Sequence, residues 1–149
     1  MGCDIHMYLE VRDTQDKWVF MKKYRLERWY SMFALFNGDV RNEGRRIRSI
    51  TNTRGLPKGV SNFIRQEYYK QMGDFHSESY FDWNDWIRFK LLKQEVAGQE
   101  YDFQRMMDEE IMFDSKYPTF MYRDLIKDLR GAAHAYGKEN ARLVFWFDN

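Results

Sequence analysis

The stretch Cys3-Asp4-Ile5-His6-Met7-Tyr8-Leu9-Glu10-Val11 decides how this chain is expected to fold. Apolar residues occupy its odd-numbered positions, and this period of two is typical of a half-buried β-strand. A turn-like run at 14–17 leads into a second apolar run at 18–21, so the two runs predict a hairpin. A third strand is expected at 142–147, buried on both faces and lying beside the first, because that run is almost entirely apolar.

Between these strands the sequence changes to the period of helices. Helices are expected near 29–36, 61–72, 82–91, 103–111 and 118–136. Gly131, inside the last of them, costs about 1 kcal/mol relative to alanine and indicates close packing at that point. We therefore expect a single α+β domain over residues 1–149. Its small antiparallel or mixed sheet, an N-terminal hairpin plus a C-terminal strand, would pack against about five helices.

The composition excludes several classes of protein. Hydrophobic residues make up 44% of the 149 residues, which is enough to build a core and argues against intrinsic disorder. No apolar run approaches the roughly 20 residues of a membrane span, so no membrane partner is expected. Cys3 is the one cysteine, so an intramolecular disulfide is impossible, which indicates a reducing, cytoplasmic setting.

The charges are balanced overall but unevenly distributed. The net charge is +1, yet residues 39–60 carry +4 and residues 74–114 carry −7. Binding to duplex nucleic acid is not expected, because the acidic half would oppose it. A compact anion bound by the basic segment is compatible with this pattern, as is an ordinary solvated loop.

Two of the three histidines follow an aspartate by two residues, in Asp4-Ile5-His6 and in Asp74-Phe75-His76. Residues two apart on a strand point to the same face, so each pair can supply two ligands to one cation, or a base and the acid that orients it. If both segments are extended and meet, their four side chains form a site for a divalent metal ion. The alternative is that the first pair is the solvent face of an edge strand and the second a loop.

The basic segment supplies further candidates. Asp39 adds a carboxylate as a fifth metal ligand, and Arg41 is expected to neutralise charge that develops on a phosphoryl group. Substrate binding is assigned to Arg54, Asn42, Ser77 and Ser79. Arginine suits this role because its planar fork matches phosphate oxygens.

Several of these motifs together resemble a family of small proteins of bacteriophages and bacteria to which no activity is assigned. The motifs are Met1-Gly2-Cys3-Asp4-Ile5-His6, Tyr30-Ser31-Met32-Phe33-Ala34, Val40-Arg41-Asn42, Arg54-Gly55-Leu56-Pro57 and Asp74-x-His76-Ser77-x-Ser79. The resemblance covers roughly the first 85 residues. It implies a phage or bacterial origin and, for a phage protein, a place in the host cytoplasm and a role against host defence.

Asp4, His6, Gly38 and Asp39 are also similar to positions of the calcineurin-like metallophosphoesterases. This sequence lacks the Asn-His-Asp/Glu element and the paired late histidines of that family, so the likeness is one of chemistry.

The sequence therefore predicts a metal-dependent hydrolase of the phosphodiesterase type, acting on a nucleotide or other small phosphorylated ligand. Its catalytic residues would be Asp4, His6, His76 and Arg41, and its metal ligands Asp4, His6, Asp39, Asp74 and His76. One alternative is a non-catalytic protein that sequesters a nucleotide. Another is an interaction module whose acidic 74–114 segment contacts a host protein.

Overall fold

The computed structural model describes residues 2–45, 47–70, 72–90, 94–96, 99–101 and 120–149. Its centre is a four-stranded sheet in the order β2-β1-β6-β3, in which every neighbouring pair is antiparallel. The strands are β1 (Asp4–Arg12), β2 (Trp18–Tyr24), β3 (Phe75–Asp82) and β6 (Ala141–Asp148). A separate two-stranded sheet pairs β4 (Gln94–Val96) with β5 (Gln99–Tyr101).

The three strands predicted from the sequence are present. β1 and β2 form a hairpin, and the Asp13 carboxylate accepts hydrogen bonds from the backbone N–H groups of Gln15 and Lys17 in its turn. β6 pairs with β1 and is buried from Ala141 to Phe147. This confirms both the position of the C-terminal strand and its burial on two faces.

Four α-helices and one 3-10 turn lie in the described part of the chain. They are α1 (Tyr30–Phe36), α2 (Asn62–Lys70), η1 (Met72–Asp74), α3 (Trp83–Lys90) and α5 (Phe120–Tyr136). The α+β class with a small antiparallel sheet is confirmed, and the expected number of about five helices is slightly off. The helix expected at 103–111 lies outside the described residues.

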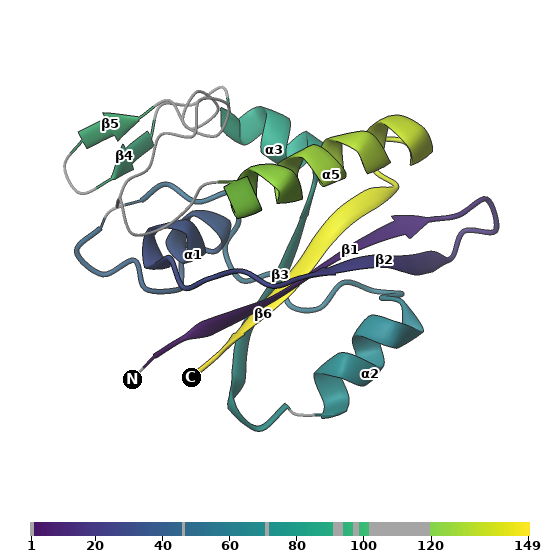
Figure 1. The fold of residues 1–149 in the computed structure, drawn as a ribbon, viewed down its shortest axis with the longest axis horizontal. Helices are drawn as coiled ribbons and strands as arrows, with labels where there is room; N and C mark the ends of the chain where they lie inside the picture. The colour runs from purple at the N-terminus through teal and green to yellow at the C-terminus, as the bar shows by residue number, and fades with distance from the viewer. Residues whose placement is uncertain (1, 46, 71, 91–93, 97–98, 102–119) are drawn as a thin grey trace.

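The helices divide unequally between the faces of the sheet: α1, α3 and α5 cover one face and α2 the other (Figure 1). The larger core lies under α1, α3 and α5, where Phe33, Phe36, Phe145 and Leu129 are fully buried. The smaller core, under α2, is built from Tyr8, Val60, Ile64, Val144 and Trp146. We call these two sides of the sheet the α5 face and the α2 face.

Two expectations need correction. The segment 75–82, which had no predicted secondary structure of its own, is the strand β3 at one edge of the sheet. Gly131 is not closely packed against the described residues, because a Cβ added there would meet none of their atoms within 4 Å. Crowding by those residues therefore does not account for a glycine at this position.

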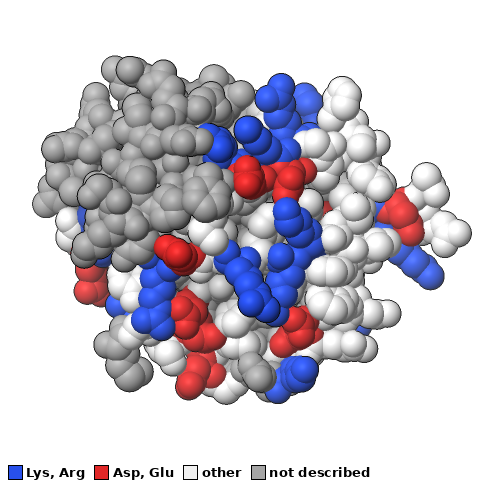
Figure 2. Space-filling view, in the orientation of Figure 1, with Lys and Arg blue, Asp and Glu red and all other residues white. Residues whose placement is uncertain are grey.

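Charged side chains of both signs lie close together on the surface. Figure 2 shows lysine and arginine beside aspartate and glutamate over much of the face in view, and Lys22, for example, lies 3.0 Å from Asp128. No helix in the described residues has the length and apolar character that a membrane span needs.

Candidate functional site at one end of the sheet

The predicted site residues are distributed around one end of the central sheet, where β1 begins, β6 ends and β3 begins. In the strand register, Asp4 is opposite Asp148, and His6 is opposite Trp146. On the other side of β6, His76 is opposite Phe147. The two Asp-x-His segments thus flank the same strand, β6, at the same end.

The two histidines nevertheless lie on opposite faces of the sheet. Residues that are paired across a ladder share a face, and consecutive residues on a strand alternate between faces. His6 shares its face with Trp146, which belongs to the α2-face core, while His76 stacks on Phe147 of the α5-face core. The expectation that both pairs line one cavity is therefore wrong.

The metal ligands expected from the sequence are correspondingly separated. The described residues contain no group of three or more His, Cys, Asp or Glu side chains placed to hold one ion. Asp4 accepts two hydrogen bonds from Arg28, at 2.6 and 3.1 Å, and the pKa of Asp4 is lowered chiefly by this contact. Asp74 is exposed in η1, just before β3.

His6 is held by a carboxylate that the sequence analysis did not select. Its Nε2 lies 2.5 Å from Oδ2 of Asp148, and each of the two side chains is 26% exposed. The imidazole lies between two aromatic rings, with centroids 5.8 Å from Trp146 and 5.1 Å from Phe75. An ionised carboxylate accepts a hydrogen bond from Nε2–H, and in the neutral imidazole this leaves Nδ1 as the acceptor nitrogen of the ring.

A cavity of about 190 Å³ adjoins this imidazole on the α2 face. It is lined by His6, Tyr8, Lys23, Glu67, Lys70 and Phe75. Lys23 forms an ion pair with Glu67 at 2.8 Å, and the pKa of Glu67 is lowered chiefly by the hydrogen bond from Lys23. Burial, and then the nearby Glu67, raise the pKa of Tyr8, so the phenol stays protonated. The cavity thus combines two ammonium groups, an imidazole and a phenol.

His76 has a different set of neighbours on the α5 face. Its Nδ1 lies 3.0 Å from the hydroxyl of Ser77, and its Nε2 lies 3.3 Å from Oδ1 of Asn149. Ser77 has a positive φ of 57° at the bulge where β3 shifts register, and its carbonyl accepts a hydrogen bond from the buried Asn37. Both ring nitrogens are therefore engaged by neutral groups.

Asp39 and Asn42 organise the loop that follows α1. The Asp39 carboxylate accepts hydrogen bonds from the N–H and hydroxyl of Thr53, at 3.1 and 2.8 Å. The Asn42 amide bridges the N–H and the carbonyl of Ile47. These contacts fix the loop itself.

Arg41 lies at the start of the sheet on the α5 face. It has a positive φ of 51°, and its guanidinium lies 4.6 Å from the centre of the Tyr30 ring. Burial raises the pKa of the Cys3 thiol, and Arg41 beside it opposes that rise. Arg41 thus belongs to a cluster with Tyr30 and Cys3, on the face that His76 shares.

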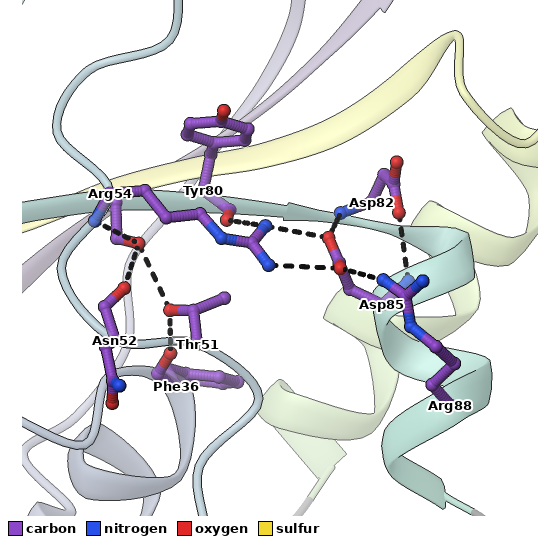
Figure 3. A network of polar contacts seen from close by, with 9 residues as sticks. Phe36, Thr51, Asn52, Arg54, Tyr80, Asp82, Asp85 and Arg88 are labelled. Carbon is purple, nitrogen blue, oxygen red and sulfur yellow. Dashed lines mark hydrogen bonds and ion pairs between the residues drawn. The ribbon is translucent and has the colours of Figure 1, made fainter.

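Arg54 and Ser79 hold the segment 51–55 against β3, as Figure 3 shows. Two nitrogens of the Arg54 guanidinium bind the two oxygens of Asp85, at 2.8 and 3.1 Å, and one of them also binds the carbonyl of Tyr80. The hydroxyl of Ser79 is buried and donates to the carbonyl of Asn52. The planar fork of Arg54 is thus occupied within the fold.

The cavity residues other than His6 were missed by reasoning from sequence. Asp148 is 142 residues from His6, and their contact depends on the register of β1 against β6. One signal could have pointed to Asp148. The first and last strands were expected to lie side by side, and an antiparallel pairing brings the end of the last strand close to the start of β1. Lys23 and Lys70 had no pattern that distinguishes them from other surface lysines.

The acidic segment proposed as an interaction surface lies partly outside the described residues, which omit 91–93, 97–98 and 102–114 of it. Its contact with a host protein stays a prediction.

Comparisons of the chain with models of protein families, with curated proteins and with solved structures give no match. The function is therefore inferred from the geometry of the site.

Proposed function

We propose that the protein binds a small phosphorylated ligand in the cavity beside His6 and hydrolyses its phosphoester with His6 as general base. The observation that supports this most is the contact of 2.5 Å between His6 and Asp148 at the wall of a cavity. A carboxylate that orients one imidazole nitrogen prepares the other to accept a proton from an attacking water. Within the described part of the chain, Nδ1 of His6 has no hydrogen-bond partner.

The phosphate group would be bound in this cavity by Lys23 and Lys70. Lys23 is partly neutralised by Glu67, whereas Lys70 forms no ion pair with an acid in the described residues. A cavity of about 190 Å³ is smaller than the 300 Å³ or more of typical drug-sized sites. We therefore expect the phosphoryl end of the ligand to enter the cavity and the remainder to lie outside it.

A divalent ion remains part of this hypothesis. Asp148 and His6 are of the types that bind divalent metals, but a third such ligand is not close to them in the described residues. Any ion at this site would thus take its other ligands from water or from the phosphate group of the substrate.

The test measures release of inorganic phosphate from a panel of phosphomonoesters and nucleotides. We expect His6→Ala to lower turnover by about 100-fold or more, the usual contribution of a general base. His76→Ala is the matched control, because it removes the same side chain from the opposite face and should leave turnover unchanged. Elemental analysis of the same three proteins shows whether a metal is present and whether it depends on His6.

Equal losses in the two variants would contradict the proposal, as would full turnover in His6→Ala. Binding of phosphate that Lys70→Ala weakens, with every ligand of the panel recovered intact, would instead identify a sequestering protein.

A further inference from the structure

A second, larger cavity lies on the other side of the molecule from the α2 face. It has a volume of about 780 Å³ and lies between the start of α3 and the second half of α5. Its lining includes Trp83 from α3, Lys127, Arg130, Gly131 and His134 from α5, and Lys138 from the loop that follows. We call it the α5 groove. Its volume falls within the range of 300–1,000 Å³ typical of small-molecule sites.

The side chains around the α5 groove are strongly basic. Figure 2 shows several lysine or arginine side chains in the region where α3 and α5 lie in Figure 1, with acidic side chains beside them. Lys127, Arg130 and Lys138 form no ion pair with an acid in the described part of the chain, in contrast to Lys22, which is paired with Asp128. Three permanent charges and His134 thus face one hollow with no described acid in its lining.

Complementing the helix dipole does not account for this arrangement. Basic residues stabilise a helix within its last turn, which here includes His134 and, just beyond, Lys138. Lys127 and Arg130 lie earlier in α5, where the dipole has little effect on a side chain. Their position on the groove side of α5 therefore needs another explanation.

Gly131 is the second observation. Glycine in a helix interior destabilises the helix relative to alanine, and no described atom within 4 Å of the missing Cβ requires a glycine here. Because Gly131 has no side chain, it leaves open space in the wall of the groove. Glycine at this position makes the helix less stable but leaves space in a basic groove. Such an arrangement is expected where a ligand occupies that space.

We propose that the α5 groove binds a small anion that carries a flat aromatic ring. The phosphate or other anionic group is bound by Lys127 and Arg130, whose charges it neutralises, and the ring packs on Trp83 above Gly131. This site is separate from the His6 cavity, so it does not depend on the proposed hydrolysis.

The test measures binding of AMP and of 1-naphthyl phosphate by calorimetry and by tryptophan fluorescence. Trp29, Trp86 and Trp146 are at most 2% exposed, and Trp18 is covered by Arg142, so Trp83 is the indole that a ligand in the groove would quench. We expect quenching by both anions, much weaker binding of uncharged adenosine, and no quenching in Trp83→Phe.

Three variants locate the site. The double variant Lys127→Ala, Arg130→Ala should weaken AMP binding by tenfold or more, since each charge-assisted contact contributes about that factor. Gly131→Leu should block the groove to a similar degree while keeping a good helix former in α5. Lys17→Ala, in the exposed β1–β2 turn, is the control and should bind AMP as the unchanged protein does.

The proposal is overturned if neither anion binds, if adenosine binds as tightly as AMP, or if the double variant and Gly131→Leu bind normally. Binding of AMP that leaves the fluorescence of Trp83 unchanged would also overturn it, because the ligand would then lie in another site, such as the His6 cavity. Thermal unfolding of each variant shows whether a loss of binding reflects a loss of fold.

Discussion

The two faces of the sheet differ in how they are covered and in what they bury. The α5 face lies under three helices, and its core is almost entirely apolar. The α2 face is covered by one helix of nine residues, and it buries an ion pair between Glu10 and Arg142 beside a small aromatic core. The His6–Asp148 contact and its cavity lie on this thinly covered face. The partly exposed His6–Asp148 contact thus lies on the face that fewer helices cover.

The same difference separates the two Asp-x-His segments. Their sequences are alike, but His6 faces α2 and meets a carboxylate, whereas His76 faces the larger core and meets neutral groups. Neither aspartate forms a hydrogen bond with its own histidine in the described structure. A repeated motif in the sequence therefore produced one acid–base couple, and its acid comes from elsewhere in the chain.

We expect the largest effect on stability when the buried ion pair on the α2 face is disrupted. Arg142 donates a hydrogen bond of 2.7 Å to Glu10, which is fully buried and also accepts from the backbone N–H of Ser61. Arg142→Met should lower the free energy of unfolding by about 3–5 kcal/mol, because it leaves a buried carboxylate without its cation. Urea denaturation of the two proteins measures this.

A double variant sharpens the result. Glu10→Met combined with Arg142→Met removes both charges and should recover most of the lost stability, since apolar pairs often replace buried ion pairs without loss. If the double variant is as unstable as the single one, the loss comes from the contact of the Arg142 guanidinium with the Trp18 ring and not from the unpaired charge.

An intermediate effect is expected at the corner where β3 leads into α3. Burial acts to raise the pKa of Asp85, but the hydrogen bonds and charge of Arg54, together with hydrogen bonds from the Asp82 backbone and Arg88, outweigh it, and the pKa falls to about 2. A lowered folded-state pKa contributes stability above the ordinary value near 3.8, and this is lost as the pH falls through about 2. Asp85→Asn should therefore cost about 2 kcal/mol at pH 7.

The same variant should show a flatter loss of stability between pH 4 and pH 2, measured by thermal unfolding across that range. Burial raises the pKa of Asp82, so protonation of Asp82 stabilises the folded state as the pH falls. This offsets part of the acid-induced loss of stability in both proteins. An unchanged acid profile in Asp85→Asn would show that the Arg54–Asp85 pair does not carry the pH dependence.

The smallest effect concerns the outer surface of the α5 face. Gly131→Ala should raise the free energy of unfolding by about 0.5–1 kcal/mol, because alanine favours the helix and its methyl group meets no neighbour. Thermal unfolding measures this. A decrease in stability would mean that the position is constrained by packing after all.

Much of the fold could be predicted because its signals are local. The alternation in β1, the apolar run of β6 and the helical spacing of α1, α3 and α5 each specify an element within a few residues. Asp82, where the helix near 82–91 is expected to begin, accepts a hydrogen bond from the N–H of Asp85. β3 was missed because its alternation is interrupted by the bulge at Ser77, so no clear period remains.

The candidate site could be predicted only in part. His6 lies on the strand that the sequence predicts, but its carboxylate partner is at the other end of the chain. Arg54 and Ser79 were selected for chemistry that suits a ligand, and the structure uses them to hold its own segments together. A side chain that binds phosphate and one that binds a buried aspartate have the same sequence signature.

The sequence by itself determined the class of the fold, the hairpin, the buried C-terminal strand and the faces of the main helices, since these follow from periods that neighbouring residues set. Only the tertiary structure decided which face each histidine occupies, which carboxylate His6 meets and which arginines are already bound. Those outcomes depend on the register of strands that are far apart in the chain, and a shift of one residue in that register moves a side chain to the opposite face.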